Sequence, residues 1–212
     1  HVLFHGNNKT FDEINMGLEY GVGVFVVDNY YELETLNTMC HKRGKQQNVY
    51  LRITPGIEAH THDYIKTGQI DSKFGFTLSN GDLQRCLEVF HKYEHLNLIG
   101  LHAHIGSQIF DVNPFLDEVE IMMTLVKDIK EQFGFEITDV DLGGGVGVYY
   151  TEKDAPKSIA QFCEAILTKA QTVCETLQID IPRLIIEPGR SIVANAGSTL
   201  YTVGSMKDIK DV

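Results

Sequence analysis

Two histidines stand two residues apart at the end of an apolar segment. Residues 98–101 suit a buried strand, and His102-Ala103-His104-Ile105-Gly106-Ser107-Gln108 follows them. Side chains two apart on a strand share one face, so His102 and His104 are expected to point the same way. Ligands of parallel α/β folds bind at the carboxyl ends of the strands, which makes this pair a candidate functional site. Two hydrogen-bonded histidines in a polar core are the alternative.

A glycine-rich loop, Gly143-Gly144-Gly145-Val146-Gly147, directly follows another apolar segment. Such a loop exposes backbone N–H groups and suits a phosphate, whereas a tight turn with positive φ is the simpler explanation. The loop lacks the Gly-Lys-Ser/Thr of a Walker sequence. No acidic residue ends a strand at the distance that a dinucleotide site requires. We favour a phosphate site at Gly143, Gly144 and Gly145.

A carboxylate and an arginine occur together in Glu187-Pro188-Gly189-Arg190, again after an apolar segment. A buried Glu–Arg pair that holds the turn is one interpretation. In the functional interpretation, Glu187 keeps a ring nitrogen protonated while Arg190 binds an anion. Arg52 ends its own strand and could be a second cation there, although a lone arginine is as easily structural.

These groups together suit pyridoxal phosphate, a phosphorylated aromatic cofactor that also needs a lysine for a Schiff base. Its ring can stack on a histidine, its nitrogen needs an acid partner, and its phosphate needs a glycine loop. Lys9 and Lys73 are candidates for the lysine by position, but neither is the next inward residue after a strand.

Strand-like and helix-like segments alternate along the chain. A long loop, 57–78, holds His60 and His62, and residues from 199 onward read as a further strand. Six β-then-α units predict a parallel α/β sheet. Polar residues end all six strands, which favours a (β/α)8 barrel that is two units short over an open doubly wound sheet. The expected strands are 2–5, 22–27, 48–53, 98–104, 140–142 and 183–186, and the expected helices are 11–20, 31–43, 82–93, 113–133 and 156–177.

Composition excludes several classes of partner. The 212 residues carry a formal net charge of −11, which argues against a nucleic acid or an anionic membrane as partner. No apolar run approaches the roughly 20 residues of a membrane span, and no signal peptide is recognisable. The four cysteines form no Cys-x-x-Cys pair, which suits idle thiols in a reducing compartment. A cytoplasmic location is therefore expected.

Six segments spread over the chain carry a resemblance to one enzyme family. The chain resembles the barrel domain of the diaminopimelate decarboxylases, pyridoxal-phosphate enzymes with the alanine-racemase-like fold. Ornithine-type decarboxylases share the fold and the Glu-Pro-Gly-Arg turn, but they usually lack the His-Gly-Asn-Asn-Lys and His-Ile-Gly-Ser-Gln segments seen here. The six segments are Phe4-His5-Gly6-Asn7-Asn8-Lys9, Leu51-Arg52-Ile53, Ser72-Lys73-Phe74-Gly75, residues 101–108, residues 142–145 and residues 187–194.

The resemblance implies a reaction and a role for each of these residues. A homodimer would use pyridoxal phosphate to decarboxylate meso-2,6-diaminopimelate to L-lysine and CO2, the last step of lysine biosynthesis. The implied cofactor contacts are His104 stacked on the ring, Arg52 beneath it, Ser107 with Gly143, Gly144 and Gly145 on the phosphate, and Glu187 on the pyridine nitrogen. Gly189 would belong to the same cofactor-binding turn, and Arg190 would contact the phosphate or a substrate carboxylate.

The resemblance also implies that part of the enzyme lies outside this chain. The family's Schiff-base lysine belongs to a Tyr-Ala-x-Lys-Ala strand expected upstream of His1, so no catalytic residue is assigned within the chain, and no metal ligand either. We interpret residues 1–198 as an incomplete pyridoxal-phosphate-binding barrel domain. Residues 199–212 would begin the connection to a C-terminal β-domain. Residues 1–212 alone are predicted to be inactive.

Three other functions stay open on the sequence. The first is another decarboxylase of the same fold, of the ornithine or arginine type. The second is a non-catalytic pyridoxal-phosphate-binding relative. The third is a metal-dependent barrel hydrolase, because His60-x-His62 and His102-x-His104 both have the spacing of metal ligands.

Overall fold

The computed structural model describes residues 2–57 and 73–208, and within these ranges helices and strands alternate. The strands are β1 (Leu3–Phe4), β2 (Val24–Val27), β3 (Gln47–Thr54), β4 (Phe76–Thr77), β5 (Leu96–Ala103), β6 (Asp139–Asp141) and β7 (Arg183–Ile185). The α-helices are α1 (Phe11–Glu19), α2 (Tyr30–Arg43), α3 (Asp82–Val89), α4 (Asn113–Phe133), α5 (Ile159–Leu177) and α6 (Gly189–Val193). Two 3-10 turns, η1 (Phe90–Lys92) and η2 (Ala194–Ala196), follow α3 and α6.

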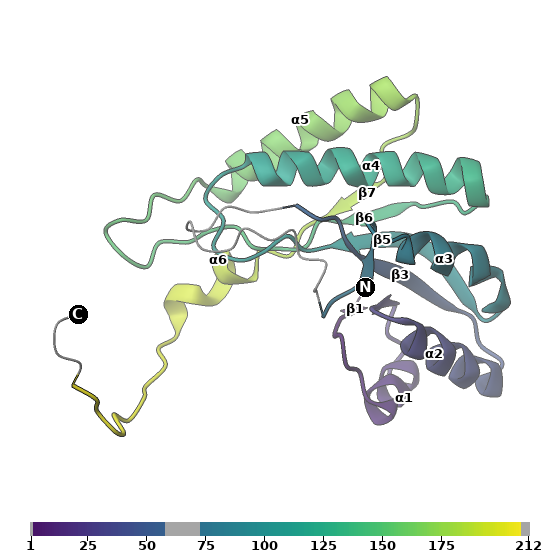
Figure 1. Ribbon diagram of the computed structural model, residues 1–212, viewed down its shortest axis with the longest axis horizontal. Helices are drawn as coiled ribbons and strands as arrows, with labels where there is room; N and C mark the ends of the chain where they lie inside the picture. Colours follow the sequence, from purple (N-terminus) through teal and green to yellow (C-terminus); the bar gives the residue numbers. More distant parts are fainter. Residues whose placement is uncertain (1, 58–72, 209–212) are drawn as a thin grey trace.

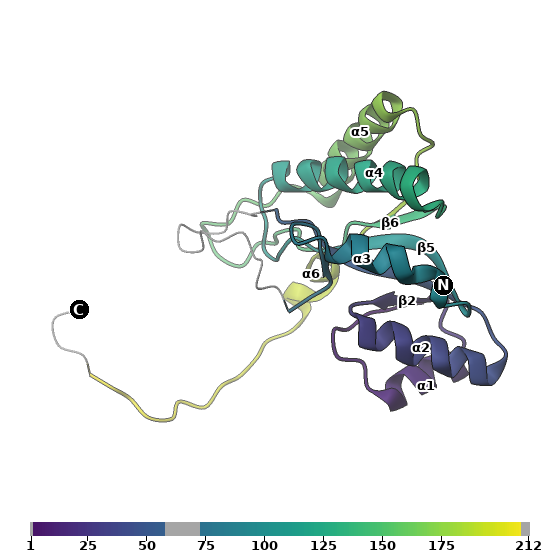
Figure 2. The same cartoon turned by 45° about the vertical axis from the view of Figure 1, so that its right-hand side comes forward.

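All the described strands form one parallel sheet in the order β1-β2-β3-β5-β6-β7, with β4 paired to β3. The sheet curls, and α1 to α5 lie along its outer side (Figures 1 and 2). This is a curled half-barrel with helices outside, so the prediction of a barrel-type parallel α/β fold is confirmed.

The two faces of the sheet differ in polarity. On β3, Val49, Leu51 and Ile53 belong to the large apolar core against the helices, whereas Tyr50 belongs to a small cluster on the inner face. Arg52 alternates with these residues and shares the inner face with Tyr50. The inner face also carries Val24 and Val26, so it combines apolar packing with polar side chains such as Arg52.

A hydrogen-bonded network fills the inner face near the amino ends of the strands. The Tyr50 hydroxyl donates to Asp139 Oδ2 at 2.9 Å, and Arg183 Nε lies 2.7 Å from Asp139 Oδ1. Gly100 lies opposite Tyr50 on β5, where a Cβ atom would approach the Tyr50 ring to 2.4 Å. The large ring therefore requires a glycine beside it, and together these groups close the base of the half-barrel.

Most of the expected elements are present, with boundaries set by local capping. Helix α5 begins at Ile159, three residues later than expected, because Ser158 accepts a hydrogen bond from Gln161 N in a capping box. Helix α2 ends where Gly44 adopts a left-handed conformation, with φ of 59°. The expected loop 57–78 contains the short strand β4, and its His60 and His62 lie outside the described residues.

The expected strand from residue 199 onward is wrong for the residues that are described. Residues 199–208 have no regular structure and run away from the half-barrel (Figure 1). Leu200 is 94% exposed, so its apolar side chain packs against nothing here. Apolar alternation predicts a strand only where a neighbouring strand is available to pair with it. In the described parts of the chain, no helix is long and apolar enough to cross a membrane.

Candidate active site at the carboxyl ends of the strands

The strand register brings three ionisable side chains level on the inner face. Arg52 on β3 pairs in register with His102 on β5, and His102 pairs with Asp141 on β6. His5 follows β1 and Glu187 follows β7, so two further groups extend from the outermost strands of the described sheet. Five strands thus direct ionisable side chains toward one region, as the parallel topology predicts.

Glu187 lies at the centre of this region. Its Oε1 atom is 2.6 Å from His5 Nε2, and its Oε2 atom is 3.5 Å from His102 Nε2. The two imidazole rings meet edge to face, with centroids 4.8 Å apart. The Glu187 side chain is 33% exposed while that of His102 is 2% exposed. The carboxylate therefore faces the opening, with the buried His102 behind it.

The charges of these groups depend on one another. Burial lowers the pKa of His102 to about 4, which leaves its imidazole neutral near pH 7. Burial and the nearby Glu187 carboxylate raise the pKa of Asp141 to about 7. Burial opposes the charge of Glu187, but the contacts with His102 and His5 outweigh it and lower the Glu187 pKa. These opposite shifts favour Glu187 over Asp141 as the ionised carboxyl of the two.

The glycine loop after β6 is packed against its neighbours on both sides. A Cβ atom would lie 2.5 Å from Ala103 O at Gly143, 2.2 Å from Glu187 O at Gly144, and 2.2 Å from Gly106 O at Gly145. Close packing alone therefore requires these three glycines.

Two of the three glycine amides of that loop already donate hydrogen bonds within the protein. Gly143 N donates to Asp141 Oδ1 at 2.9 Å, and Gly144 N donates to His104 Nδ1 at 3.2 Å. Of these three glycines, Gly145 is the one whose amide has no hydrogen-bond acceptor within the described part of the chain. Phosphate binding by all three amides stays a prediction, and Gly145 is the best placed of them.

A serine and an arginine form a second polar group at the same end of the sheet. Arg190 Nε donates to Ser107 Oγ at 2.9 Å, and Arg190 Nη1 donates to the Tyr150 hydroxyl at 3.0 Å. These side chains are exposed and therefore open to an anion, and Gly189 beside Arg190 leaves open space. The predicted residues Ser107 and Arg190 thus meet directly. Tyr150 was not predicted, and its position three residues after Gly147 was the available signal.

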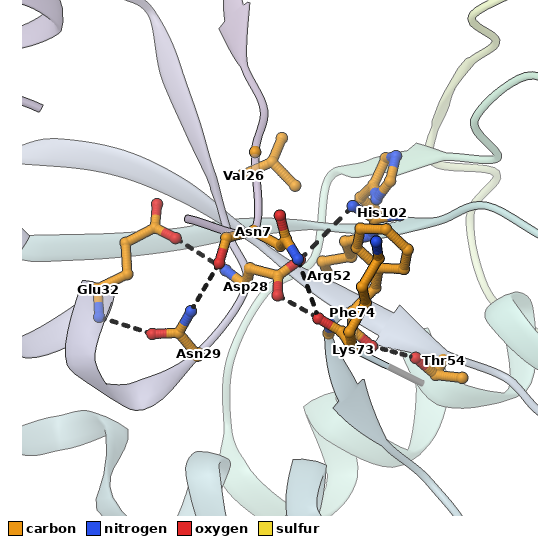
Figure 3. Close-up of polar contacts among 12 residues, drawn as sticks. Asn7, Val26, Asp28, Asn29, Glu32, Arg52, Thr54, Lys73, Phe74 and His102 are labelled. Carbon is orange, nitrogen blue, oxygen red and sulfur yellow. Dashed lines mark hydrogen bonds and ion pairs between the residues drawn. The ribbon is translucent and has the colours of Figure 1, made fainter. Parts of the chain in front are cut away.

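Arg52 is held from two sides (Figure 3). Its Nη1 atom lies 3.5 Å from Asp28 Oδ1, and its guanidinium stacks on the Phe74 ring at 4.3 Å from the centroid. The other Asp28 oxygen accepts a hydrogen bond from Gly75 N at 3.1 Å. Arg52 and His104 line one pocket of about 410 Å³. Asp28, absent from the predicted site, therefore fixes both this arginine and the 73–75 loop.

Lys9 is not placed as a cofactor lysine would be. Lys9 is buried, and its ammonium donates to Gly6 O at 2.8 Å, Val26 O at 2.7 Å and Glu32 Oε1 at 2.6 Å. All three of its N–H donors hold the chain together, which makes Lys9 a structural residue. The Lys73 ammonium lies over the Phe74 ring, 5.1 Å from its centroid.

His102 and His104, whose spacing suggested a metal site, do not group together in the structure. His104 Nδ1 accepts a hydrogen bond from the Gly144 amide, while His102 groups with three other side chains. One ligand atom each from His5, His102, Asp141 and Glu187 lies within 4.8 Å of the others, a set that could also hold a metal ion. The pair His60 and His62 lies outside the described residues.

A half-barrel with a carboxylate, a serine–arginine pair and a glycine loop at its mouth has the groups that a phosphorylated cofactor would need. The chain belongs to the family described as pyridoxal-dependent decarboxylase, pyridoxal binding domain, whose model matches residues 1–194. Membership of this family implies pyridoxal phosphate as the cofactor.

Individual relatives agree with the family. The chain is 47% identical over 211 residues to the diaminopimelate decarboxylase of Bacillus subtilis, covering 100% of this chain and 48% of the relative. It resembles the crystal structure of diaminopimelate decarboxylase from M. jannaschii, with a TM-score of 0.81 and 37% identity over 92% of this chain and 44% of that one. A Helicobacter pylori diaminopimelate decarboxylase complexed with L-lysine matches with a TM-score of 0.75 and 31% identity, over 91% and 46% of the two chains. The chain spans about half the length of these relatives.

Proposed function

We propose that the natural polypeptide carrying this chain decarboxylates meso-diaminopimelate to L-lysine and CO2 with pyridoxal phosphate. The observation that supports this most is Glu187, an anion held by two histidines at the mouth of the half-barrel. Relatives named diaminopimelate decarboxylase, 39–47% identical over nearly the whole chain, support the choice of substrate.

The residues at the mouth fit this cofactor by their chemistry. A pyridine nitrogen needs an acid partner, and Glu187 is the anionic member of its carboxyl pair. A phosphate needs cationic and N–H or O–H donors, which Arg190, Ser107 and Gly145 supply. An aromatic ring needs a flat surface, which His104 offers beside Arg52 in one pocket.

When bound, pyridoxal phosphate accepts the electron pair that remains after CO2 leaves the substrate. The residues of this chain are proposed to bind and orient the cofactor and the substrate. Glu187 would keep a proton on the ring nitrogen, and the Gly144 N–H bond to Nδ1 fixes the tautomer and orientation of His104. Arg190 would bind phosphate or a substrate carboxylate. Asp28 would keep the Arg52 guanidinium in position.

Further parts of the proposal follow from the resemblance. By the resemblance, the Schiff-base lysine would come from a segment outside residues 1–212, so these residues alone would not decarboxylate the substrate. Residues 1–198 would form the pyridoxal-phosphate-binding barrel domain, and residues 199–212 would lead to a C-terminal β-domain. The enzyme would be a cytoplasmic homodimer.

The test is release of labelled CO2 by the complete natural polypeptide. Carboxyl-labelled meso-diaminopimelate, ornithine and arginine are each supplied with and without pyridoxal phosphate. Release from diaminopimelate alone, dependent on the cofactor, is expected. Faster release from ornithine or arginine would assign the other decarboxylase class. Cofactor binding without release from any substrate would indicate a non-catalytic relative.

A further inference from the structure

Three side chains around Glu187 have no role yet in the proposed reaction. His5, His102 and Asp141 come from three separate strand ends, and their ligand atoms lie within 4.8 Å of each other and of Glu187. Each Glu187 oxygen has its own imidazole, His5 Nε2 at 2.6 Å and His102 Nε2 at 3.5 Å. A flexible glutamate gains a fixed orientation when both of its oxygens are contacted from different strands.

Burial shows that two of these groups, His102 and Asp141, face the interior of the cluster and not solvent. The His102 side chain is 2% exposed and Asp141 is fully buried, with its Oδ2 atom unpartnered among the described residues. Asp141 Oδ1 accepts a hydrogen bond from the Gly143 amide. Buried polar groups are destabilising unless their partners compensate, so such a cluster is expected where function needs it.

We propose that His5, His102 and Asp141 are positioning residues that orient the Glu187 carboxylate. This rests on the proposed function, because an anionic, oriented Glu187 is what holds a proton on the ring nitrogen of pyridoxal phosphate. Asp141 lies in the same cluster, and the two imidazoles contact the Glu187 carboxylate.

The proton balance depends on every charged group that faces the cluster. His102 and Asp141 lie in register with Arg52 on β3, whose guanidinium contacts Asp28 at the end of β2. His104, beyond the end of β5, lies close enough to Arg52 and Glu187 to feel their charges. A pH profile of the cluster therefore includes these groups as well.

His5 is the best residue to change because its side chain is 29% exposed and its replacement leaves no closed cavity. His5→Gln keeps an N–H donor near the same place, whereas His5→Leu removes it. His91→Leu, on the exposed η1 turn, is the matched control. Pyridoxal phosphate affinity is measured on the complete natural polypeptide, alongside a carbocyclic analogue in which C–H replaces the ring nitrogen.

We expect His5→Leu to weaken pyridoxal phosphate binding about ten- to a hundredfold, as loss of a close polar contact to a charged group does. His5→Gln should stay within about threefold of the wild type. Binding of the analogue should not change, because it has no nitrogen for Glu187 to hold. His5→Leu should add nothing in a Glu187→Gln background, since both act through the same carboxylate.

A measurement on the cofactor-free protein keeps the inference separate from the proposed function. The 13C signal of the Glu187 carboxyl, assigned by its loss in Glu187→Gln, reports protonation directly. We expect its titration midpoint to rise in His5→Leu and to stay near the wild-type value in His5→Gln and His91→Leu.

Three results would overturn the inference: an unmoved midpoint, equal loss of analogue binding, or additive effects of His5→Leu and Glu187→Gln. A stoichiometric metal ion in the purified protein, lost in His5→Leu, would also overturn it and make the cluster a metal site. A wild type that binds no pyridoxal phosphate but shows the midpoint shift would refute the proposed function and leave the positioning role standing.

Discussion

The middle glycine of the loop after β6 gives a direct test of how the site is held together. The Gly144 backbone lies outside the left-handed region, so alanine meets no strain there, yet a Cβ atom would lie 2.2 Å from Glu187 O. Ordinary contact begins at 3.4 Å. Gly144→Ala therefore requires the backbone of Glu187 to move by about 1.2 Å, since both contacting atoms belong to or adjoin the main chain.

Two consequences of this displacement can be measured. Overpacking in a well-packed region lowers the free energy of unfolding by about 1–3 kcal/mol, which urea denaturation reports. Misplacing a reacting group by about 1 Å can lower turnover about a hundredfold. We therefore expect Gly144→Ala to fold with reduced stability and to lose at least about tenfold in pyridoxal phosphate affinity or turnover.

Gly197→Ala is the matched control. Its Cβ would have no atom within 4 Å, and its φ of −136° suits any residue, so neither stability nor affinity should change. If Gly144→Ala behaved like Gly197→Ala in both assays, the close approach of the two loops would not hold in the folded protein. The account of how Glu187 is positioned would then be refuted.

Three further predictions follow from the contacts. Lys9→Met should lower the free energy of unfolding in urea by about 3–5 kcal/mol, because it leaves the buried Glu32 carboxylate unpaired, and Lys9→Met/Glu32→Gln should recover part of the loss; equal stability of Lys9→Met and wild type would contradict this. Asp141 has a folded pKa of about 7 against 3.8 when free, so its stabilising contribution is complete below pH 3.8 and is lost as the pH rises through 7. The stability of the wild type relative to Asp141→Asn should therefore fall by about 1.4 kcal/mol per pH unit between about pH 4 and pH 7 and level off above that, whereas a constant difference would show an unshifted carboxyl. Arg190→Gln should weaken pyridoxal phosphate binding about ten- to a hundredfold and Ser107→Ala about threefold to tenfold, in a fluorescence titration that His91→Leu leaves unchanged.

Much of the fold could be predicted because its signals are local. Apolar runs such as Val24–Val27 and the regular alternation of strands and helices require no knowledge of distant contacts. The tail was wrong for the opposite reason, since alternation at Leu200 and Val203 has meaning only beside another strand. Helix starts moved by a few residues because a capping residue such as Ser158 decides them.

The site residues were likewise predicted where the signal is local in the sequence and missed where it depends on distant contacts. Ser107, Arg190 and Glu187 stand in conspicuous motifs at strand ends, and the structure brings Ser107 and Arg190 into contact. His5 and Asp141 were not assigned to the site, because their importance arises only when the register of distant strands places them behind Glu187. The glycine loop was predicted from its composition, but the carbonyl contacts that require Gly144 and Gly145 come from segments distant in the sequence.

The most direct test of the account is a crystal structure of the complete natural polypeptide with pyridoxal phosphate. We predict the ring nitrogen within hydrogen-bond distance of Glu187, the ring against His104, and the phosphate at Ser107, Gly145 and Arg190. The contrary result is cofactor density elsewhere, or a metal ion held by His5, His102, Asp141 and Glu187. Either finding would show that the cluster around Glu187 serves a different chemistry.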